Sequence, residues 1–250
     1  MEINPNLRIS TMTLISNLNS DINLDNLYDS IEINDIFRYI EHGPLKRKGK
    51  KEKEKINKKC FYNQITIHIF EDKIINMKIF NNGKIQMTGA KSKLQGSNAL
   101  NVLIRRIKSL DENIKSKIMT NVDFEPSNIE IGMINSDFDC GFKIKRENLH
   151  RIVIEKGYYS SFEPTIYPGV NIKYYYNPLK QTDGICNCTE KCNGKGENGC
   201  CKKITIAVFN SGKIIITGGK SYTQYNKSYD FINDILENNK DELFLKNEKV

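Results

Sequence analysis

Five of the seven cysteines in the chain lie within one 16-residue stretch and follow the spacing C-x-C-x3-C-x7-C-C. They are Cys186, Cys188, Cys192, Cys200 and Cys201. Thiolate sulfur is a preferred ligand of zinc, and four thiolates close a tetrahedral site. The stretch therefore predicts a structural zinc ion. It is the one cofactor that the sequence suggests, and the expected binding function requires none. Because paired C-x-x-C knuckles are absent, a flexible loop with reduced or adventitiously oxidised thiols remains the alternative.

A second chemical feature is the run of positive charge at residues 45–59, which reads LKRKGKKEKEKINKK. It contains nine Lys or Arg residues and two Glu, a net charge of +7, whereas the whole chain carries a formal +8. Such a run can bind nucleic-acid phosphates, because each neutralised phosphate adds salt-dependent affinity. A solvated insertion or a localisation signal is the alternative interpretation.

No group of residues predicts an active site. His42, His68 and His150 are dispersed, and the sequence contains no phosphate-binding loop, H-E-x-x-H motif or nucleophile elbow. We therefore expect a binding protein and no enzyme. No apolar run approaches the about 18 residues that cross a bilayer, so no membrane partner is expected.

An internal repeat determines which elements position these residues. Residues 77–92 read MKIFNNGKIQMTGAKS and residues 206–221 read IAVFNSGKIIITGGKS, so nine of the 16 aligned positions are identical. Each copy predicts a strand, an Asn/Ser-Gly turn, a second strand and a helix, because the turn residues accept positive φ. Two such halves predict a pseudo-twofold molecule.

Apolar residues at helical spacing follow each copy. They are Ala99, Leu100, Leu103, Ile104 and Ile107 after the first copy, and Tyr225, Tyr229, Ile232, Ile235 and Leu236 after the second. Each half begins with a strand-like segment, at residues 9–24 and 128–144, that contains an Asn-Ser-Asp turn. These segments lead into helices expected near residues 24–39 and 146–156.

The repeated F-x-x-G-K-x-x-x-T-G-x-K resembles the signature hairpin of the TATA-box-binding protein (TBP) family. Residues 159–169, YSSFEPTIYPG, resemble the loop of this family known as the second-repeat stirrup. The resemblance covers most of the chain in the right order, with insertions at 45–59 and 178–203. It indicates a divergent member of the family, of the kind that a large DNA virus would encode.

The resemblance implies an α+β fold, the TBP-like saddle. Two pseudo-symmetric repeats would share a continuous curved antiparallel sheet, with helices on its convex side. The first repeat would occupy residues 1–120 and the second residues 121–250, and the Cys-rich loop would join two strands next to the Tyr167 stirrup. In this family the sheet binds the minor groove of A+T-rich double-stranded DNA and aromatic wedges open its base steps.

Position by position, the resemblance implies DNA contacts for aromatic, threonine and lysine side chains. The wedges would be Phe80, Phe209, Tyr167 and either Phe61 or Tyr62. Thr88 and Thr217 would bind base edges, with Gln86 and Ile215 beside them. Phosphate contacts are implied for Lys84, Lys91, Lys173, Lys213 and Lys220.

The first strand of each repeat departs from the family, which has a central Asn there. The first half offers Thr11, and the second offers Asn128 with Glu130 on the same face, where a carboxylate would oppose phosphates. The alternative register, shifted by one residue, leaves no Asn on that face. Either register weakens the expectation of strict TATA recognition.

The opposite surface of the family binds other transcription proteins. Glu163 and Ile166 match stirrup positions that contact TFIIB, and Arg105, Arg106 and Lys108 form a basic helix face used by partners. The sequence thus predicts an initiation factor that bends promoter DNA and recruits a TFIIB-like factor and RNA polymerase. The alternatives are an interaction scaffold with weak or lost TATA specificity and an accessory subunit of an enzyme. Its location would be a nucleus, or a cytoplasmic viral factory or virion.

Overall fold

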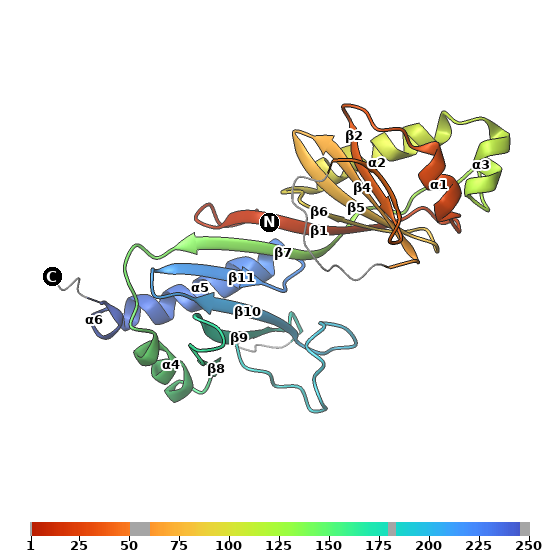
Figure 1. The fold of residues 1–250 in the computed structure, drawn as a ribbon. Helices are drawn as coiled ribbons and strands as arrows, with labels where there is room; N and C mark the ends of the chain where they lie inside the picture. The colour runs from red at the N-terminus through yellow and green to blue at the C-terminus, as the bar shows by residue number, and fades with distance from the viewer. Residues whose placement is uncertain (1, 51–60, 180–183, 246–250) are drawn as a thin grey trace. The chain divides into compact units, whose positions relative to one another are not determined.

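The computed structural model describes residues 2–50, 61–179 and 184–245, which form two compact units (Figure 1). The first unit is Thr11–Gly132; the second unit combines Met1–Ser10 with Met133–Val250. The sequence placed the division between residues 120 and 121, whereas the units divide at Gly132, and the first ten residues belong with the second unit. Residues 51–59 of the basic run, and Cys60, lie outside the described residues.

The first unit contains most of strand β1 and three helices. Its elements are β1 (Arg8–Asn17), α1 (Leu24–Ser30), β2 (Phe37–His42), β3 (Lys46–Gly49), β4 (Gln64–Glu71), β5 (Lys73–Phe80), β6 (Lys84–Thr88), α2 (Lys93–Lys108) and α3 (Glu112–Ile118). The strands pair in the order β3-β2-β4-β5-β6-β1, and every pair is antiparallel.

The second unit repeats this arrangement. Its elements are β7 (Glu130–Asp139), α4 (Arg146–Glu155), β8 (Tyr159–Ser161), β9 (Val170–Tyr176), β10 (Lys202–Val208), β11 (Lys213–Thr217), α5 (Tyr222–Asn238) and α6 (Lys240–Leu243). The strand order is β7-β11-β10-β9-β8, again antiparallel. The predicted α+β class with antiparallel strands is therefore confirmed.

The repeated turn forms as the sequence predicts. Gly83 has φ of 75° and Gly212 has φ of 90°, and each amide donates to the carbonyl of Phe80 or Phe209 at 3.0 Å. A Cβ added at either glycine would lie 2.3 Å from a backbone oxygen, so no other residue fits. The last residue of each copy, Ser92 or Ser221, caps the N-terminus of α2 or α5.

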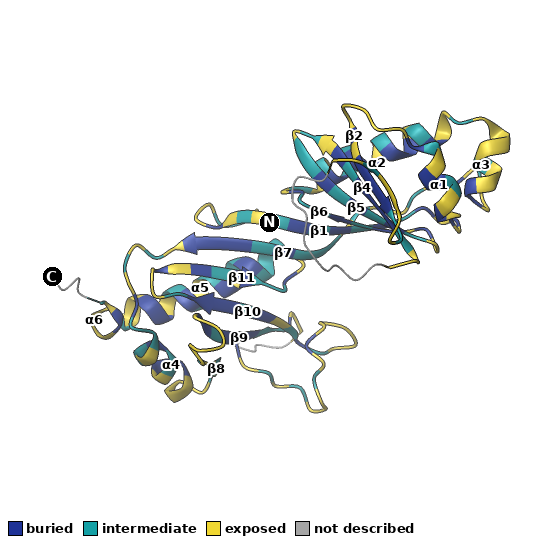
Figure 2. Cartoon of the chain, in the orientation of Figure 1, coloured by how far each residue is buried: buried dark blue, intermediate teal, exposed yellow. Residues whose placement is uncertain are grey.

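One face of each sheet forms the core and lies against the helices (Figure 2). All five apolar residues predicted for α2 are buried, as are Tyr225, Ile232, Ile235 and Leu236 of α5; Tyr229 is half-buried against Phe138. Buried and half-exposed residues alternate along the strands, as expected for a sheet covered on one side. We call the other side the open face.

The two cores exchange large and small side chains at equivalent positions. In the first unit, a Cβ on Gly96 of α2 would lie 2.2 Å from Leu14 of β1. The repeat aligns Gly96 with Tyr225 of α5, which is fully buried, and aligns Leu14 with the buried Ser136. Gly219 makes room in turn, because a Cβ there would lie 2.5 Å from the Tyr225 ring. Volume lost on one element is thus restored on its neighbour.

Two local predictions are wrong. The helix expected to reach residue 39 ends at Ser30, because the Asn34 side chain accepts from the amides of Ile36 and Phe37 and starts β2. The Asn-Ser-Asp sequence forms a turn only in the first half, where Asn19 has φ of 56°. In the second half the same three residues lie inside β7, paired with β11.

Among the described residues, no helix is long and apolar enough to span a membrane.

Candidate nucleic-acid interface

The open face of the second unit carries a row of polar side chains across four strands. Asn135 of β7 pairs with Thr217 of β11, and Thr217 pairs with Thr205 of β10, which pairs with Lys173 of β9. The Thr217 hydroxyl donates to Asn135 Oδ1 at 2.6 Å, and Lys173 Nζ donates to Thr205 Oγ1 at 2.9 Å. Burial, together with the charge of nearby Lys203, lowers the pKa of Lys173. The row offers fixed donors and acceptors to a ligand lying on the sheet.

The first unit places different residues at the same register. Thr13 pairs with Thr88, and Thr88 pairs with Asn76, which pairs with His68. Asn76 Nδ2 lies 3.1 Å from His68 Nε2, and its buried Oδ1 has no hydrogen-bond partner among the described residues. The predicted Thr11 also lies on this face, where its hydroxyl accepts from the Gly89 amide at 3.1 Å.

Two residues further along the same strands, the polar and the apolar member of the pair change places between the two units. Ile15 pairs with Gln86 in the first unit, whereas Asp137 pairs with Ile215 in the second. Asp137 accepts two hydrogen bonds from Arg8 Nη2, at 2.9 and 2.8 Å, and a further one from the Ser10 hydroxyl. Burial acts to raise the pKa of Asp137, but these hydrogen bonds and the Arg8 charge outweigh it and lower the pKa below its ordinary value.

An aromatic pair stands at the end of β10. The rings of Tyr167 and Phe209 meet edge to face with centroids 5.8 Å apart, and Tyr167 is 38% exposed. Gly169 makes room for them, because a Cβ there would lie 2.9 Å from the Tyr167 ring. Val208, one residue before Phe209, is fully buried, so Phe209 points to the open face as predicted. Arg146 of α4 holds this loop by donating to the Pro168 carbonyl.

The first unit presents its aromatic residues separately. Phe80 ends β5 on the open face, and Ile79 before it is fully buried. Phe61 is 55% exposed and Tyr62 is 74% exposed. Within the part of the chain that the structure describes, no ring contact joins either residue to Phe80, so the choice between them stays open.

The other predicted DNA contacts lie on or beside the open face. Gln86 and Ile215 are half-buried on β6 and β11, and Lys84 and Lys213 begin these strands. Lys91 and Lys220 are exposed just after the strands. Asn128 precedes β7 and is exposed. The Asn of β7 that lies on the open face is Asn135, which the sequence reasoning assigned to a turn.

The described start of the basic run makes contacts within its own unit. Residues 46–49 form β3 and not a loop. Lys46 pairs with Asp25 at 2.6 Å, Arg47 lies 3.6 Å from Glu41, and Lys48 Nζ donates to the Tyr28 carbonyl at 2.9 Å. These three cations are therefore engaged, and any phosphate tether would depend on residues beyond them.

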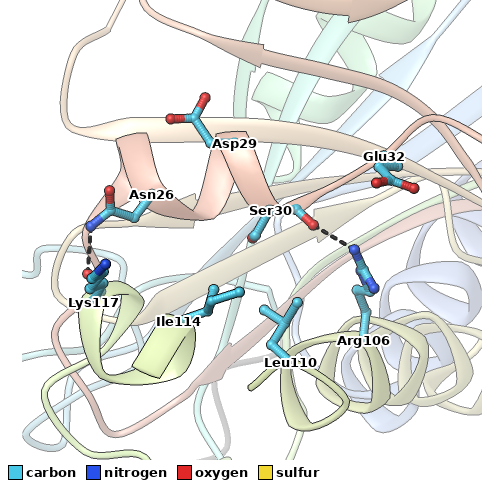
Figure 3. A pocket seen from close by; sticks show the side chains of 8 residues that line it. All are labelled: Asn26, Asp29, Ser30, Glu32, Arg106, Leu110, Ile114 and Lys117. Carbon is cyan, nitrogen blue, oxygen red and sulfur yellow. Dashed lines mark hydrogen bonds between the residues drawn. The ribbon is translucent and has the colours of Figure 1, made fainter. Parts of the chain in front are cut away.

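The predicted partner residues have different surroundings. Arg106 lines a pocket of about 370 Å³ between α1, α2 and α3, and donates to the Ser30 carbonyl at 2.7 Å (Figure 3). Lys108 lies 3.5 Å from Glu125 and is exposed, as is Arg105, whereas Arg106 is half-buried. On the second unit, Glu163 is exposed and Ile166 is 84% exposed.

Four of the five clustered cysteines come together. The sulfurs of Cys186, Cys188, Cys192 and Cys201 all lie within 4.8 Å of one another, whereas Cys200 is outside the group. Hydrogen bonding to Cys201 lowers the pKa of Cys188 to about 7, and burial raises the pKa of Cys201 to about 12. The loop joins β9 and β10, the two strands next to the stirrup, and leaves β9 at Tyr176, six residues from the stirrup end at Val170.

Comparison with known proteins finds similarity to one family. The family model described as "Transcription factor TFIID (or TATA-binding protein, TBP)" matches residues 128–239. A "TATA-box-binding protein-like" protein of Acanthamoeba polyphaga mimivirus is 30% identical over 92% of this chain and 65% of its own length. The "TATA-box-binding protein" of Bombyx mori is 29% identical over 64% of this chain and 39% of its own length. The chain therefore spans less than two thirds of these relatives.

The solved structure of Methanococcus jannaschii TBP matches 94% of this chain and 99% of its own, with a TM-score of 0.58 and 20% identity. The fold is thus that of the TBP class. Together, the partial family match, the sequence relatives and this fold support a divergent TBP-like protein. The mimivirus relative agrees with the expectation of a viral TBP-like protein.

Proposed function

We propose that this protein is a transcription initiation factor that binds A+T-rich duplex DNA in the minor groove through the open faces of its sheets. The observation that carries the proposal is the Tyr167–Phe209 pair, which stands half-exposed at the end of β10, on the same open face as the Thr217–Asn135 hydrogen bond. Phe80 occupies the equivalent position of the first repeat. Aromatic side chains placed this way can enter a base step and kink the duplex.

The chemistry of the open face fits a groove read by shape more than by base code. Threonine hydroxyls and asparagine amide nitrogens can donate hydrogen bonds, and the minor groove of A·T pairs displays acceptors only. T-A steps unstack most easily, so a wedge favours A+T-rich sequence without a unique contact at each pair. Lys84, Lys213 and Lys173 supply charge for the flanking phosphates.

Recruitment of other proteins would use the stirrup and the helices. The exposed Ile166 and Glu163 form a compact apolar and acidic site for a TFIIB-like factor, through which RNA polymerase would be recruited. Arg105 on α2 offers a second contact. A chain acting this way needs no active site and works where transcription occurs, in a nucleus or in a viral factory.

A second function, an interaction scaffold with weak or lost TATA specificity, is favoured by Asp137. Its carboxylate lies on the open face and is ionised, because its pKa is lowered. Although Arg8 balances the charge, an acid on this face opposes a phosphate-lined groove.

The test measures binding and bending of a TATA duplex and of a G·C-rich duplex by FRET across a salt series. We expect A+T-selective binding with a bend that disappears in Phe80→Ala/Phe209→Ala and persists in Leu94→Ala, a control that removes an exposed apolar residue from α2. Weak, unselective binding without a bend would contradict the initiation factor and favour the scaffold.

A further inference from the structure

The loop between β9 and β10 is built around four thiols whose spacing matches a metal site. Cys188 Sγ and Cys201 Sγ are 3.5 Å apart, and all four sulfurs lie within 4.8 Å of one another. Zinc–sulfur bonds of about 2.3 Å in a tetrahedron place the sulfurs about 3.8 Å apart. A disulfide would require about 2.05 Å. The sulfur–sulfur distance expected around zinc therefore lies between the 3.5 Å separation of Cys188 and Cys201 and the 4.8 Å upper limit of the group.

The backbone of the loop fixes two of these sulfurs through a tight turn. Lys195 pairs with Lys202, the Gly196 amide donates to the Cys201 carbonyl at 3.1 Å, and the Lys203 amide donates to the Gly194 carbonyl at 2.9 Å. Gly194 has φ of 69°, which permits this turn. Cys192 and Cys201 thus stand on the two arms of a short hairpin.

The other two sulfurs come from the segment that returns alongside β9. Gly184 pairs with Tyr175, with its carbonyl accepting from the Tyr175 amide at 3.0 Å. A Cβ at Gly184 would lie 3.1 Å from both Phe231 and Tyr174, so this return passes close to the core. Cys186 and Cys188 follow directly and have intermediate burial.

The composition of the loop argues that a metal orders it. In the sequence of residues 184–201, Ile185 is the one large apolar residue besides cysteine, and it is 45% exposed. Four glycines and several charged residues raise the entropy cost of ordering. Without apolar burial, small loops of this kind are held by metal ions or cross-links.

We propose that Cys186, Cys188, Cys192 and Cys201 bind one Zn²⁺ as a closed tetrathiolate site. Soft thiolates in a tetrahedron favour zinc, and four protein ligands leave no position for a reacting water, so the site is structural. It joins the return segment to the hairpin and fastens the ends of β9 and β10. These ends lie about 20 Å along the strands from the stirrup, given six residues at roughly 3.3 Å each. The site is therefore independent of the proposed DNA wedge.

The experiment measures zinc in the purified full chain by mass spectrometry of the metal. We expect about one zinc per chain, lost in Cys188→Ser and in Cys186→Ser. Cys200→Ser is the matched control, because Cys200 adjoins a ligand but lies outside the cluster. Equal zinc content in Cys188→Ser and Cys200→Ser would overturn the proposal, as would iron in place of zinc.

A second measurement keeps the test decisive if the serine variants fold poorly. Zinc is removed from the wild-type chain with a chelator, and Co²⁺ is added. The expected result is the absorption of tetrahedral cobalt with strong thiolate charge-transfer bands, displaced by Zn²⁺. An octahedral cobalt spectrum, or a disulfide detected by the mass change on reduction of freshly purified protein, would overturn it.

Discussion

The two repeats share one backbone register but present different chemistry on their open faces. Thr88 faces Thr13 in the first unit, whereas Thr217 donates a hydrogen bond to Asn135 in the second. Phe80 lacks the ring contact that Tyr167 gives Phe209 in the described structure. The two units therefore keep the same strand pairing while their side chains differ. As a result, the two ends of the proposed DNA ligand would meet different side chains.

The largest loss of stability should come from removing the large side chain that fills the core of the second unit. Tyr225→Ala removes a fully buried ring whose hydroxyl donates to the Ile134 carbonyl and accepts from the Gly219 amide. We expect a loss of about 3–5 kcal/mol in the free energy of unfolding, measured by urea titration. Tyr222→Ala, at the half-exposed start of the same helix, is the control. Equal losses in the two variants would show that Tyr225 does not fill the second core.

The wedge comparison comes next. Phe209→Ala removes the residue whose ring is already positioned by Tyr167. Phe80→Ala removes its equivalent, for which the described structure shows no ring contact. Given about 1–3 kcal/mol for a base-stacking aromatic, each should weaken binding of a TATA duplex by roughly 5-fold to 150-fold. We expect Phe209→Ala to lose more, since its pair is preorganised. Identical dissociation constants and bend angles would remove the functional difference between the repeats.

Asp137 allows the comparison to be tested by pH. Its lowered pKa means that its ion pair stabilises the fold above the unfolded-state pKa of about 3.9, and that this stability is lost as the pH falls through the folded-state pKa. Asp137→Asn should cost about 1–3 kcal/mol at neutral pH and reduce the further loss below about pH 4. Asp230→Asn on exposed α5 is the control. Unchanged acid sensitivity of Asp137→Asn, followed by circular dichroism, would contradict this role.

The smallest effect concerns the central threonines. Thr217→Val removes the donor to Asn135, whereas Thr88→Val has no equivalent bond to break. We expect Thr217→Val to weaken TATA binding by about 1 kcal/mol, near fivefold, and Thr88→Val to do less. Competition for the protein between TATA duplexes of opposite sequence orientation would measure whether this difference sets the direction in which the protein binds. A larger loss for Thr88→Val would reverse the assignment.

The sequence predicted the elements that repeat, because identical residues carry them. Gly83 and Gly212 require the same turn, and Ser92 and Ser221 require the same cap. It failed at Asn135, because Asn-Ser-Asp is a turn in one half and a strand in the other. Local propensity could not decide between them; strand pairing with β11 did.

The cysteine loop shows the same limit in another form. The spacing alone predicted five candidate ligands. In the structure, with its hairpin between Lys195 and Lys202, four of the sulfurs lie together and Cys200 lies outside the group. Similarly, charge counting predicted a free basic run, whereas contacts such as Lys46 with Asp25 depend on which strand lies beside which helix. These are properties of tertiary arrangement that one sequence does not contain.

Residues 2–10 precede the first unit in the sequence but belong to the second, where Arg8 and Ser10 bind Asp137. During synthesis, the first unit can close once Gly132 has left the ribosome. The second unit must wait for its last strand and helix, although residues 2–10 are made before the first unit. The contact between Arg8 and Asp137 therefore spans the whole first unit in sequence, and the order of assembly differs from the order of translation.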